Sequence, residues 1–267
     1  MDDVPKILYK FRSFDGYGKK FLTNYEMFAA SPSRFNDPFD IAMPYLYDSK
    51  TIDDERFKEK FLSSVNGPLD NEKMSILVNK LEERNKFRKD YPEEYIAETR
   101  NEIIKADSKF YGVISLAKNF NNILMWSHYA KYHKGYCLGL DTDLIINCIT
   151  QKYQIRSYRF GHVMYVHDYP LLNFDDSNWK KNAIAQTFSK SKHWEYEDEY
   201  RLILMNKSNY TIIYPKEAIK SIFLGCKMTK NDKQKILSFV KRKKIIADVF
   251  EAKMSSSKFE LDFNKIH

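Results

Sequence analysis

Short hydrophobic runs rich in β-branched and aromatic residues alternate with charged segments along the chain, a pattern that predicts many strands. We expect strands at residues 7–12, 26–31, 110–117, 136–141, 162–166, 199–205, 211–215, 221–225 and 247–254, the last of them at a sheet edge. Helical spacing predicts helices at 16–24, 123–135, near 180–191 and at 229–243. Gly135 is expected to end the second of these helices, and Thr229 to cap the last.

Between about residues 50 and 108 the pattern changes to a charged segment with helical periodicity. Its apolar residues recur mostly at intervals of three and four: Met74, Leu77, Val78 and Leu81 before Pro92, and Ile96, Ile103 and Ile104 after it. The segment separates the first two predicted strands from all the others. We therefore expect a helical insertion or cap between two parts of one sheet.

The order of the elements favours an α+β fold with a mixed, mostly antiparallel sheet, because a strand pair is followed by helices and then mainly by strands. A regular βαβ array is not expected. Neither GxGxxG nor GxxxxGK[ST] occurs, so Rossmann and P-loop sites have no support. The 267 residues, 43% of them hydrophobic, suffice for a single domain over 1–267 that includes the insertion.

Composition restricts the cellular compartment and the class of binding partner that we expect. No apolar run approaches the roughly 20 residues that span a bilayer, and the start MDDVPKILYKF does not resemble a signal peptide, so we expect a cytoplasmic protein. The three cysteines lack a CxxC spacing and are typical of buried thiols in a reducing compartment. A formal charge of +8 favours nucleic acid or an anionic cofactor as partner, although a generally basic surface would give the same number.

The first strand carries a candidate anion-binding residue. Because side chains alternate in a strand, Leu8, Lys10 and Arg12 share one face, and Tyr9 and Phe11 share the other. Arg12 ends the strand, where its planar guanidinium can clamp a phosphate or carboxylate. The alternative is an ordinary surface ion pair.

The block FNDPFD predicts an ordered polar turn. Pro38 excludes the α region for Asp37, and the side chains of Asn36 and Asp37 can bond nearby backbone groups. The turn either shapes the wall of a pocket or is purely structural.

The block MWSHYAKYHKG carries the densest set of aromatic and histidine side chains. On a helix, Trp126, His128 and Tyr129 could stack on a ring and donate hydrogen bonds, or they could belong to a core helix. His128 and His133 are five residues apart, which does not fit the i, i+4 spacing of a helical zinc site. We expect no metal ion here.

In the block WEYEDEYR, Glu195, Glu197, Glu199 and Arg201 would share a face if the segment were extended. Glu199 stands where the charged run meets the apolar strand, a suitable place for a general base or a carboxylate that stabilises a cation. A solvated run of charges is the alternative.

Together these blocks resemble an uncharacterised bacterial family with a domain of unknown function. The resemblance rests on LYKFRS, FNDPFD, ISLA, LMWSHYA, HKGYCLGLD and YEDEYRL and runs from about residue 7 to 240. It covers the segment 50–108 least. The family implies no activity.

A second resemblance implies one. An Arg on the first strand, a Ser on a central strand and a Glu at the start of a late strand are similar to the Arg-Ser-Glu pattern of ADP-ribosyltransferases, and the matching positions are Arg12, Ser115 and Glu199. In that family a split mixed sheet binds NAD without a Rossmann motif. Ser115 is followed by Leu116 and Ala117, so the family's Ser-Thr-Ser signature is absent.

The resemblance implies roles for named residues. Arg12 would hold a phosphate or ribose hydroxyl of NAD, Trp126 or Tyr129 would stack on nicotinamide, and Glu199 would stabilise the oxocarbenium-like transition state. The remaining expected site residues are Tyr9, Asn36, Asp37 and Ser115 for NAD binding and His128 for catalysis.

The leading hypothesis is an NAD-dependent ADP-ribosyltransferase-like toxin or anti-phage effector that modifies RNA or DNA and has a possible antitoxin partner. Two alternatives stay open. One is a non-catalytic module that binds nucleic acid or nucleotides. The other is a metal-dependent nuclease that uses Asp37, Glu197 and Glu199.

Overall fold

A computed structural model describes residues 4–42, 55, 59, 70–170 and 179–267. Its strands are β1 (Ile7–Arg12), β2 (Glu26–Ala29), β3 (Tyr111–Ala117), β4 (Tyr136–Asp141), β5 (Tyr158–His162), β6 (Met164–Val166), β7 (Ser189–Ser191), β8 (Glu199–Met205), β9 (Tyr210–Ile213), β10 (Ile219–Leu224), β11 (Asp248–Met254) and β12 (Leu261–Lys265). Its helices are α1 (Gly16–Thr23), α3 (Asn71–Asp90), α4 (Pro92–Phe110), α5 (Ile123–Tyr129), α6 (Thr142–Asn147), α7 (Trp179–Phe188) and α8 (Lys230–Lys243). Shorter helical turns are η1 (Pro32–Arg34), η2 (Cys148–Lys152), η4 (Lys192–Glu197) and η5 (Lys216–Ala218).

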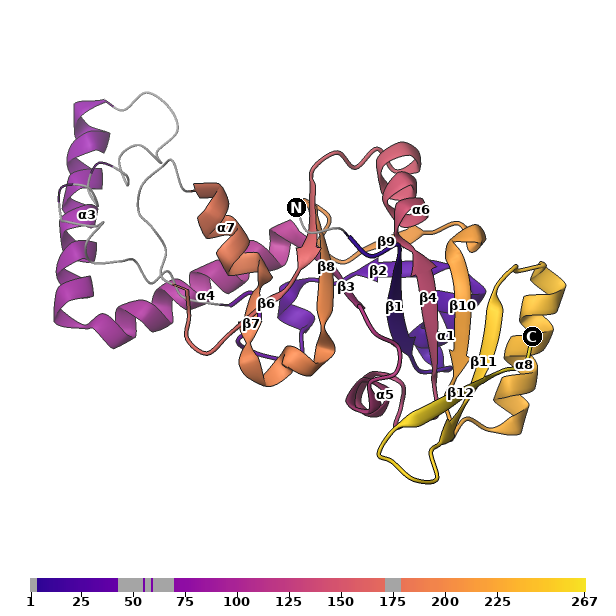
Figure 1. The fold of residues 1–267 in the computed structure, drawn as a ribbon. Coiled ribbons are helices and arrows are strands. Elements are labelled where there is room, and N and C mark those ends of the chain that lie inside the picture. The colour runs from indigo at the N-terminus through magenta and orange to yellow at the C-terminus, as the bar shows by residue number, and fades with distance from the viewer. Residues whose placement is uncertain (1–3, 43–54, 56–58, 60–69, 171–178) are drawn as a thin grey trace.

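The main sheet has eight strands in the order β12-β11-β10-β4-β1-β3-β8-β5 (Figure 1). All neighbours are antiparallel except β10 and β11, which are parallel. Two small sheets, β2-β9 and β6-β7, flank it. The α+β class and the mixed, mostly antiparallel sheet that the sequence predicts are therefore confirmed.

The main sheet nearly divides between β1 and β3. These strands share a single register pair, Tyr9 with Ala117. In contrast, β1 pairs with β4 from Ile7 to Arg12, and β3 pairs with β8 over its whole length. The sheet thus consists of two well-paired parts that meet at one point, and polar side chains can enter the gap that opens beyond it.

The larger hydrophobic core lies on the face of the sheet that α1, α6 and α8 cover. Leu8, Leu138 and Ile222 point into it from three neighbouring strands. On the opposite face, α5 covers Phe11 and Cys137 with Trp126. Full burial of each large apolar side chain contributes roughly 1.5–3 kcal/mol, so both faces hold β1 and β4 firmly in place.

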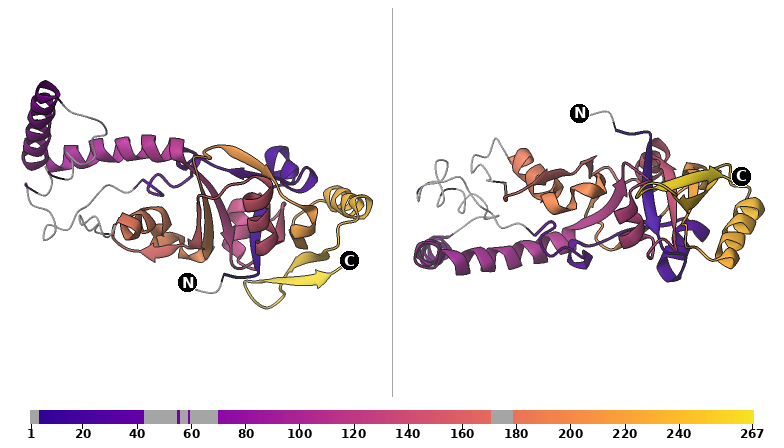
Figure 2. Two further views of the ribbon diagram at one scale, coloured as in Figure 1. Left: turned by 90° about the horizontal axis from the view of Figure 1, so that it is seen from above. Right: turned by 60° about the horizontal axis from the view of Figure 1, so that its bottom comes forward.

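Helices α3 and α4 form an arm that projects away from the sheet (Figure 2). They confirm the helical character expected for this part of the chain, and α4 continues directly into β3. Residues 50–54, 56–58 and 60–69 of the expected insertion lie outside the described residues. Within the described part of the chain, no helix has the length and apolar character needed to cross a membrane.

The helix expected at 123–135 is too long. Helix α5 ends at Tyr129, and Lys131, Tyr132 and His133 follow with positive φ angles of 48°, 56° and 65°. The reason is the close approach of Gly135 to β1, because a Cβ at Gly135 would lie 2.2 Å from the carbonyl oxygen of Arg12. The chain must leave the helix early to make that approach.

Other boundaries also differ from the expectation. β11 is not the sheet edge, because β12 pairs with it on the outside. The sequence pattern missed β12, although Leu261 and Phe263 alternate with polar residues in it. It also missed β5, and Glu195 and Glu197 do not lie on an extended segment, because η4 forms a helical turn there. Asp198 adopts a left-handed conformation with φ of 42° and separates η4 from β8.

Candidate functional site

A cleft of about 620 Å³ opens where β1 and β3 part. Its volume lies within the range of roughly 300–1,000 Å³ that is typical of small-molecule sites. Both strands line it, together with α1, α5, η1 and the segments that carry Lys190, Glu197 and Glu199. Side chains distant in the sequence therefore meet on its walls.

One end of the cleft is cationic. The Nε of Arg12 is buried and has no hydrogen-bond partner, and the guanidinium lies 5.5 Å from the centre of the Phe21 ring. Among the described residues no carboxylate forms an ion pair with Arg12. Burial lowers the pKa of the Arg12 guanidinium. A buried cation without an acidic partner is a natural site for an anionic ligand.

Two more basic side chains line the cleft. The ammonium of Lys10 donates to the carbonyl oxygen of Ser115, and burial, followed by the charge of Arg12, lowers the Lys10 pKa well below its ordinary value. The guanidinium of Arg34 lies 5.6 Å from the centre of the Phe28 ring.

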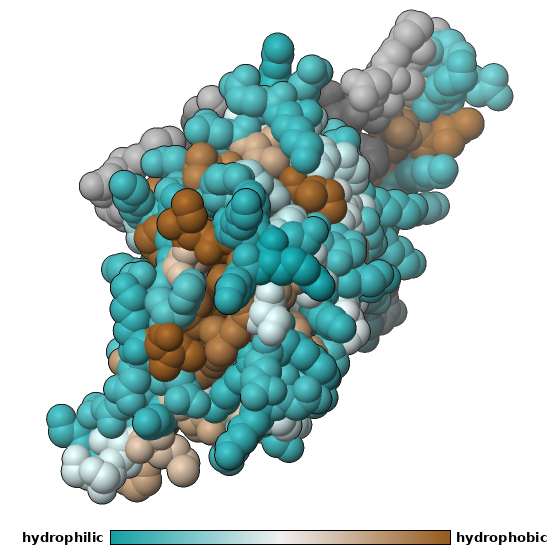
Figure 3. Space-filling view, turned by 90° about the vertical axis from the view of Figure 1, so that its right-hand side faces the viewer, coloured by the Kyte–Doolittle hydropathy of each residue, from teal (hydrophilic) through white to brown (hydrophobic). Residues whose placement is uncertain are grey.

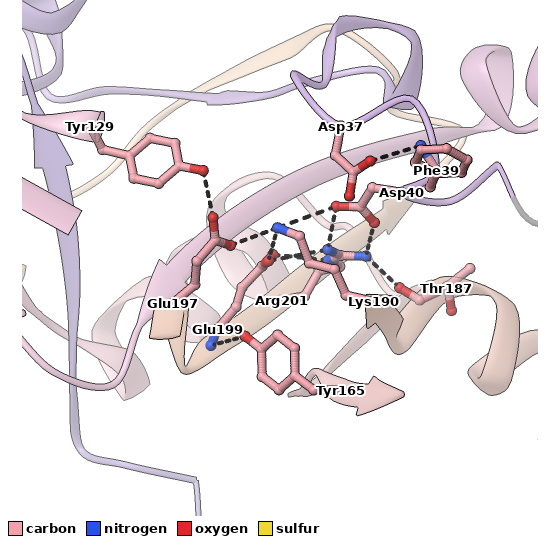
Figure 4. A network of polar contacts seen from close by, with 10 residues as sticks. All are labelled: Asp37, Phe39, Asp40, Tyr129, Tyr165, Thr187, Lys190, Glu197, Glu199 and Arg201. Carbon is pink, nitrogen blue, oxygen red and sulfur yellow. Dashed lines mark hydrogen bonds and ion pairs between the residues drawn. The ribbon is translucent and has the colours of Figure 1, made fainter. Parts of the chain in front are cut away.

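The opposite end holds a buried charge network centred on Arg201 (Figure 4). Arg201 donates to both carboxylate oxygens of Asp40 at 3.0 and 2.9 Å and to both of Glu199 at 2.9 and 3.2 Å. A further bond of 2.8 Å reaches the carbonyl oxygen of Thr187. All five N–H donors are used, so Arg201 holds Asp40 and Glu199 in fixed positions.

Lys190 occupies the space between three carboxylates in the same network (Figure 4). Its Nζ lies 2.6 Å from Glu197, 3.3 Å from Glu199 and 3.6 Å from Asp40. Burial alone would lower the Lys190 pKa, but the three carboxylates raise it above its ordinary value. Lys190 therefore stays protonated and supplies the positive charge at the centre of the carboxylates.

The pKa values of the two glutamates of the network are shifted in opposite directions. Burial raises the pKa of Glu197, and the charge of Lys190 only partly opposes it. Burial would also raise the pKa of Glu199, but Arg201 and Lys190 lower it to about 2. Glu199 is thus a permanent anion at neutral pH, whereas Glu197 is the carboxyl placed to exchange a proton.

Tyr129 connects Glu197 to the other wall of the cleft. Its hydroxyl donates to Glu197 at 2.5 Å and also hydrogen-bonds to Asn36. Burial, followed by the nearby charge of Glu197, raises the Tyr129 pKa, so the phenol stays protonated. Ser115 hydrogen-bonds to Glu199 from β3, and the backbone N–H of Glu199 donates to the Tyr165 hydroxyl at 2.8 Å.

The carboxyl of Glu197 is expected to titrate above the ordinary glutamate range when its side-chain ¹³C shift is followed by NMR. Replacing Lys190 by methionine should raise this pKa further, because the variant removes the cation that favours the charged form. Lys192→Met, which removes an exposed lysine paired with Glu195, should leave the Glu197 titration unchanged. A Glu197 pKa that does not respond to Lys190→Met would contradict this account.

The structure brings most of the expected site residues together. Tyr9, Arg12, Asn36, Ser115, His128, Tyr129 and Glu199 all line the cleft. Trp126 does not, because it is fully buried, packs against Phe11 and donates its Nε1 to the carbonyl oxygen of Phe120 at 2.7 Å. The expectation that Trp126 stacks on a ligand is therefore wrong.

Asp37 is also absent from the cleft wall. It is buried in the turn, where it accepts a hydrogen bond of 2.9 Å from the backbone N–H of Phe39. The structural interpretation of this Asx-Pro turn is thus correct for Asp37. The same turn nevertheless places Asp40, which the sequence analysis did not single out, against Arg201.

Sequence reasoning missed the residues that hold the site together: Lys10 as a cleft residue, Arg34, Asp40, Lys190 and the central role of Arg201. One signal for Arg201 was present, since a charged residue directly before the apolar run LILM in a central strand must be paired if it is buried. Lys190 has no comparable signal, because it stands among other lysines and serines.

Neither a cysteine nucleophile nor a carboxylate metal site is supported. Burial raises the pKa of Cys137, Cys148 and Cys226. In the regions that the structure describes, no three His, Cys, Asp or Glu side chains are arranged to hold a metal ion. The nuclease set is not assembled either, because Asp37 lies away from the cleft.

Residues 125–202 match a family of proteins of unknown function, DUF2971. The matched region runs from α5 to β8 and contains Tyr129, Lys190, Glu197, Glu199 and Arg201. The match confirms the resemblance to a family of unknown function for HKGYCLGLD, for YEDEYRL and, apart from Leu124, for LMWSHYA. The blocks LYKFRS, FNDPFD and ISLA lie outside the matched residues. No curated protein and no solved structure matches the chain.

Proposed function

We propose that this protein is an NAD-dependent ADP-ribosyltransferase that modifies a nucleic acid and acts as a toxin or anti-phage effector. One observation carries the proposal. Arg12, Ser115 and Glu199 stand on the neighbouring strands β1, β3 and β8 and line one cleft at the point where the sheet divides. This is the Arg-Ser-Glu order of ADP-ribosyltransferases, and the similarity in fold remains part of the proposal.

The charges of the cleft fit NAD. Its pyrophosphate would bind at the cationic end, where the buried Nε of Arg12 has no partner, Arg34 adds positive charge and Lys10 adds a further N–H donor. Tyr9, Phe28 and Phe35 supply aromatic surface along the wall for the rings of the ligand. The nicotinamide ribose would then lie at the acidic end, near Glu199.

Bound NAD would supply an activated C1′–nicotinamide bond. When this bond breaks, its electron pair leaves with nicotinamide, which becomes neutral, and positive charge develops on the ribose. Glu199 is suited to stabilise that charge, because its pKa of about 2 keeps it ionised and Arg201 fixes its position. The acceptor then bonds to C1′ and loses a proton, which Glu197 can take.

Incubation with labelled NAD and purified RNA, DNA or lysate protein tests the proposal. Transfer of label to RNA or DNA is the expected result, with release of one nicotinamide per ADP-ribose transferred. Binding of nucleic acid without consumption of NAD in any of these mixtures would refute it. Degradation of nucleic acid only after addition of a divalent metal would instead indicate a nuclease. Growth arrest on expression would support the effector role.

Arg12→Ala is expected to weaken NAD binding about 10- to 100-fold, because charge-assisted hydrogen bonds to a phosphate contribute roughly 1.5–3 kcal/mol. Calorimetric titration with NAD measures the change. Lys20→Ala removes an exposed cation from α1 outside the cleft wall and should leave the affinity unchanged. Equal NAD affinities of the wild type and Arg12→Ala would show that Arg12 does not contribute to NAD binding.

A non-catalytic nucleotide-binding module is the second candidate. The observation that favours it is the pairing of Asp40, Glu197 and Glu199 with Lys190 and Arg201, which would also stabilise a purely structural wall. This candidate predicts that NAD or another nucleotide binds at Arg12 and is recovered unchanged.

A further inference from the structure

The positive charge of the chain is concentrated in one segment. Residues 227–244 contain eight of the 44 basic residues and one of the 36 acidic residues, so they carry a net charge of +7 out of the total of +8. The rest of the chain is almost neutral. A generally basic surface is therefore not the explanation of the net charge, which resides on and around α8.

Helix α8 presents these charges to solvent. Its apolar residues Ile236, Phe239 and Val240 are buried in the core. Its exposed face consists of basic and neutral polar residues without an acid: Lys230, Asn231, Gln234, Lys235, Ser238, Lys241 and Arg242. The single acid of the helix, Asp232, donates its backbone N–H to the Oγ1 of Thr229 at 3.1 Å, and its carboxylate lies 3.4 Å from the Nζ of Lys235.

We infer that the exposed face of α8 binds the phosphate backbone of a nucleic acid. From Lys230 to Arg242 the helix rises about 18 Å, a length along which one strand of a duplex carries about five phosphates. Asn231, Gln234 and Ser238 stand between the cations and offer the neutral donors that commonly contact phosphate and sugar. The contact is independent of sequence, because none of these features selects a base.

A membrane surface fits α8 less well. Insertion into lipid needs an apolar helix face, and the apolar face of α8 already packs on the sheet. Exposed hydrophobic residues do occur on the side of the molecule that carries α8, β11 and β12 (Figure 3). Ile246, Met254 and Phe259 are 95%, 72% and 100% exposed, but they follow the helix rather than belong to it. Anionic vesicles are therefore the competing ligand in the test.

A chain of contacts connects the turn before α8 with the cleft. The backbone N–H of Lys227 donates to the carbonyl oxygen of His133 at 3.0 Å, and Lys131 in the same turn forms an ion pair with Asp15. Asp15 begins α1, whose Tyr17 lines the cleft. Helices α1 and α8 also cover the same face of the sheet. Under the proposed function, a nucleic acid held on α8 would be the acceptor, but the binding itself needs no NAD.

The test compares two variants that lose the same charge. Lys230, Lys235, Lys241 and Arg242 are changed to glutamine in one, and the exposed Lys80, Lys86, Lys105 and Lys109 of α3 and α4 in the other. Binding of a labelled RNA oligonucleotide and a DNA duplex is measured without NAD over a range of salt concentrations. The slope of log K against log salt should fall in magnitude by about three to four for the duplex in the α8 variant only.

Three outcomes would overturn the inference: no binding by the wild type, equal losses in the two variants, or binding of phosphatidylserine vesicles that displaces the nucleic acid. Thermal melting establishes that both variants are folded. Since NAD consumption is measured separately, failure of the transferase proposal would leave this result intact, and failure of α8 binding would leave NAD cleavage intact.

Discussion

Replacement of Arg201 by methionine is expected to lower the free energy of unfolding by about 3–5 kcal/mol. The guanidinium is fully buried and pairs with Asp40 and Glu199, which are themselves buried. Its loss would leave two carboxylates with Lys190 as their principal remaining cation. Urea unfolding followed by circular dichroism measures the change.

Two controls separate loss of charge pairing from loss of packing. Lys192→Met removes an exposed ion pair with Glu195 and should change stability by less than about 1 kcal/mol. The triple variant Asp40→Asn, Glu199→Gln and Arg201→Met should recover part of the loss, because it no longer buries unpaired charge. A loss below about 1 kcal/mol for Arg201→Met alone would mean that the network contributes little to stability.

Glu199→Gln is expected to lower the rate of ADP-ribosyl transfer about 10²- to 10³-fold while NAD still binds. The substitution keeps the shape of the side chain but removes the negative charge that, in the proposed reaction, would stabilise the developing cation. Rates of label transfer and NAD affinity are measured on the same samples. Glu195→Gln, at an exposed position of the same block, should keep the wild-type rate.

The pH dependence of the transfer rate distinguishes the role of Glu199 from that of Glu197. Because the Glu199 pKa is about 2, this carboxylate is ionised at every pH above about 4, and its charge gives no acid limb near neutrality. A limb that belongs to Glu197 should lie above the ordinary glutamate range and disappear in Glu197→Gln. If Glu199→Gln transfers ADP-ribose at the wild-type rate in a folded protein, the catalytic role passes to another group.

The sequence was informative where a local pattern decides the structure. Thr229 caps α8 as expected, and its Oγ1 accepts a hydrogen bond from the backbone N–H of Asp232. Alternation in β1 correctly separates Leu8 from Tyr9 and Phe11. Arg12, Ser115 and Glu199 could be placed at one cleft because each has a recognisable position on a strand.

It was uninformative where distant segments decide the outcome. Nothing local distinguishes Lys190 from the exposed Lys192, although one is buried among carboxylates and the other is not. Asp40 acquires its partner from a strand 161 residues away. Trp126 has the chemistry of a stacking residue, but the helix orients it toward Phe11 and the core.

The arrangement of strands around the division of the sheet also has a kinetic consequence. The chain crosses between the two parts repeatedly, since β1 and β4 belong to one part and β3 and β8 to the other. Ile7 must pair with Asp141, and Tyr111 with Met205, before the two parts can form their ladders of backbone hydrogen bonds. Such long-range pairing slows folding. In contrast, each doubling of the length of the connecting loop raises the free-energy cost of closing that loop by only about 0.6 kcal/mol. We therefore expect the helical arm between β2 and β3 to slow folding more than it lowers the stability of the folded protein.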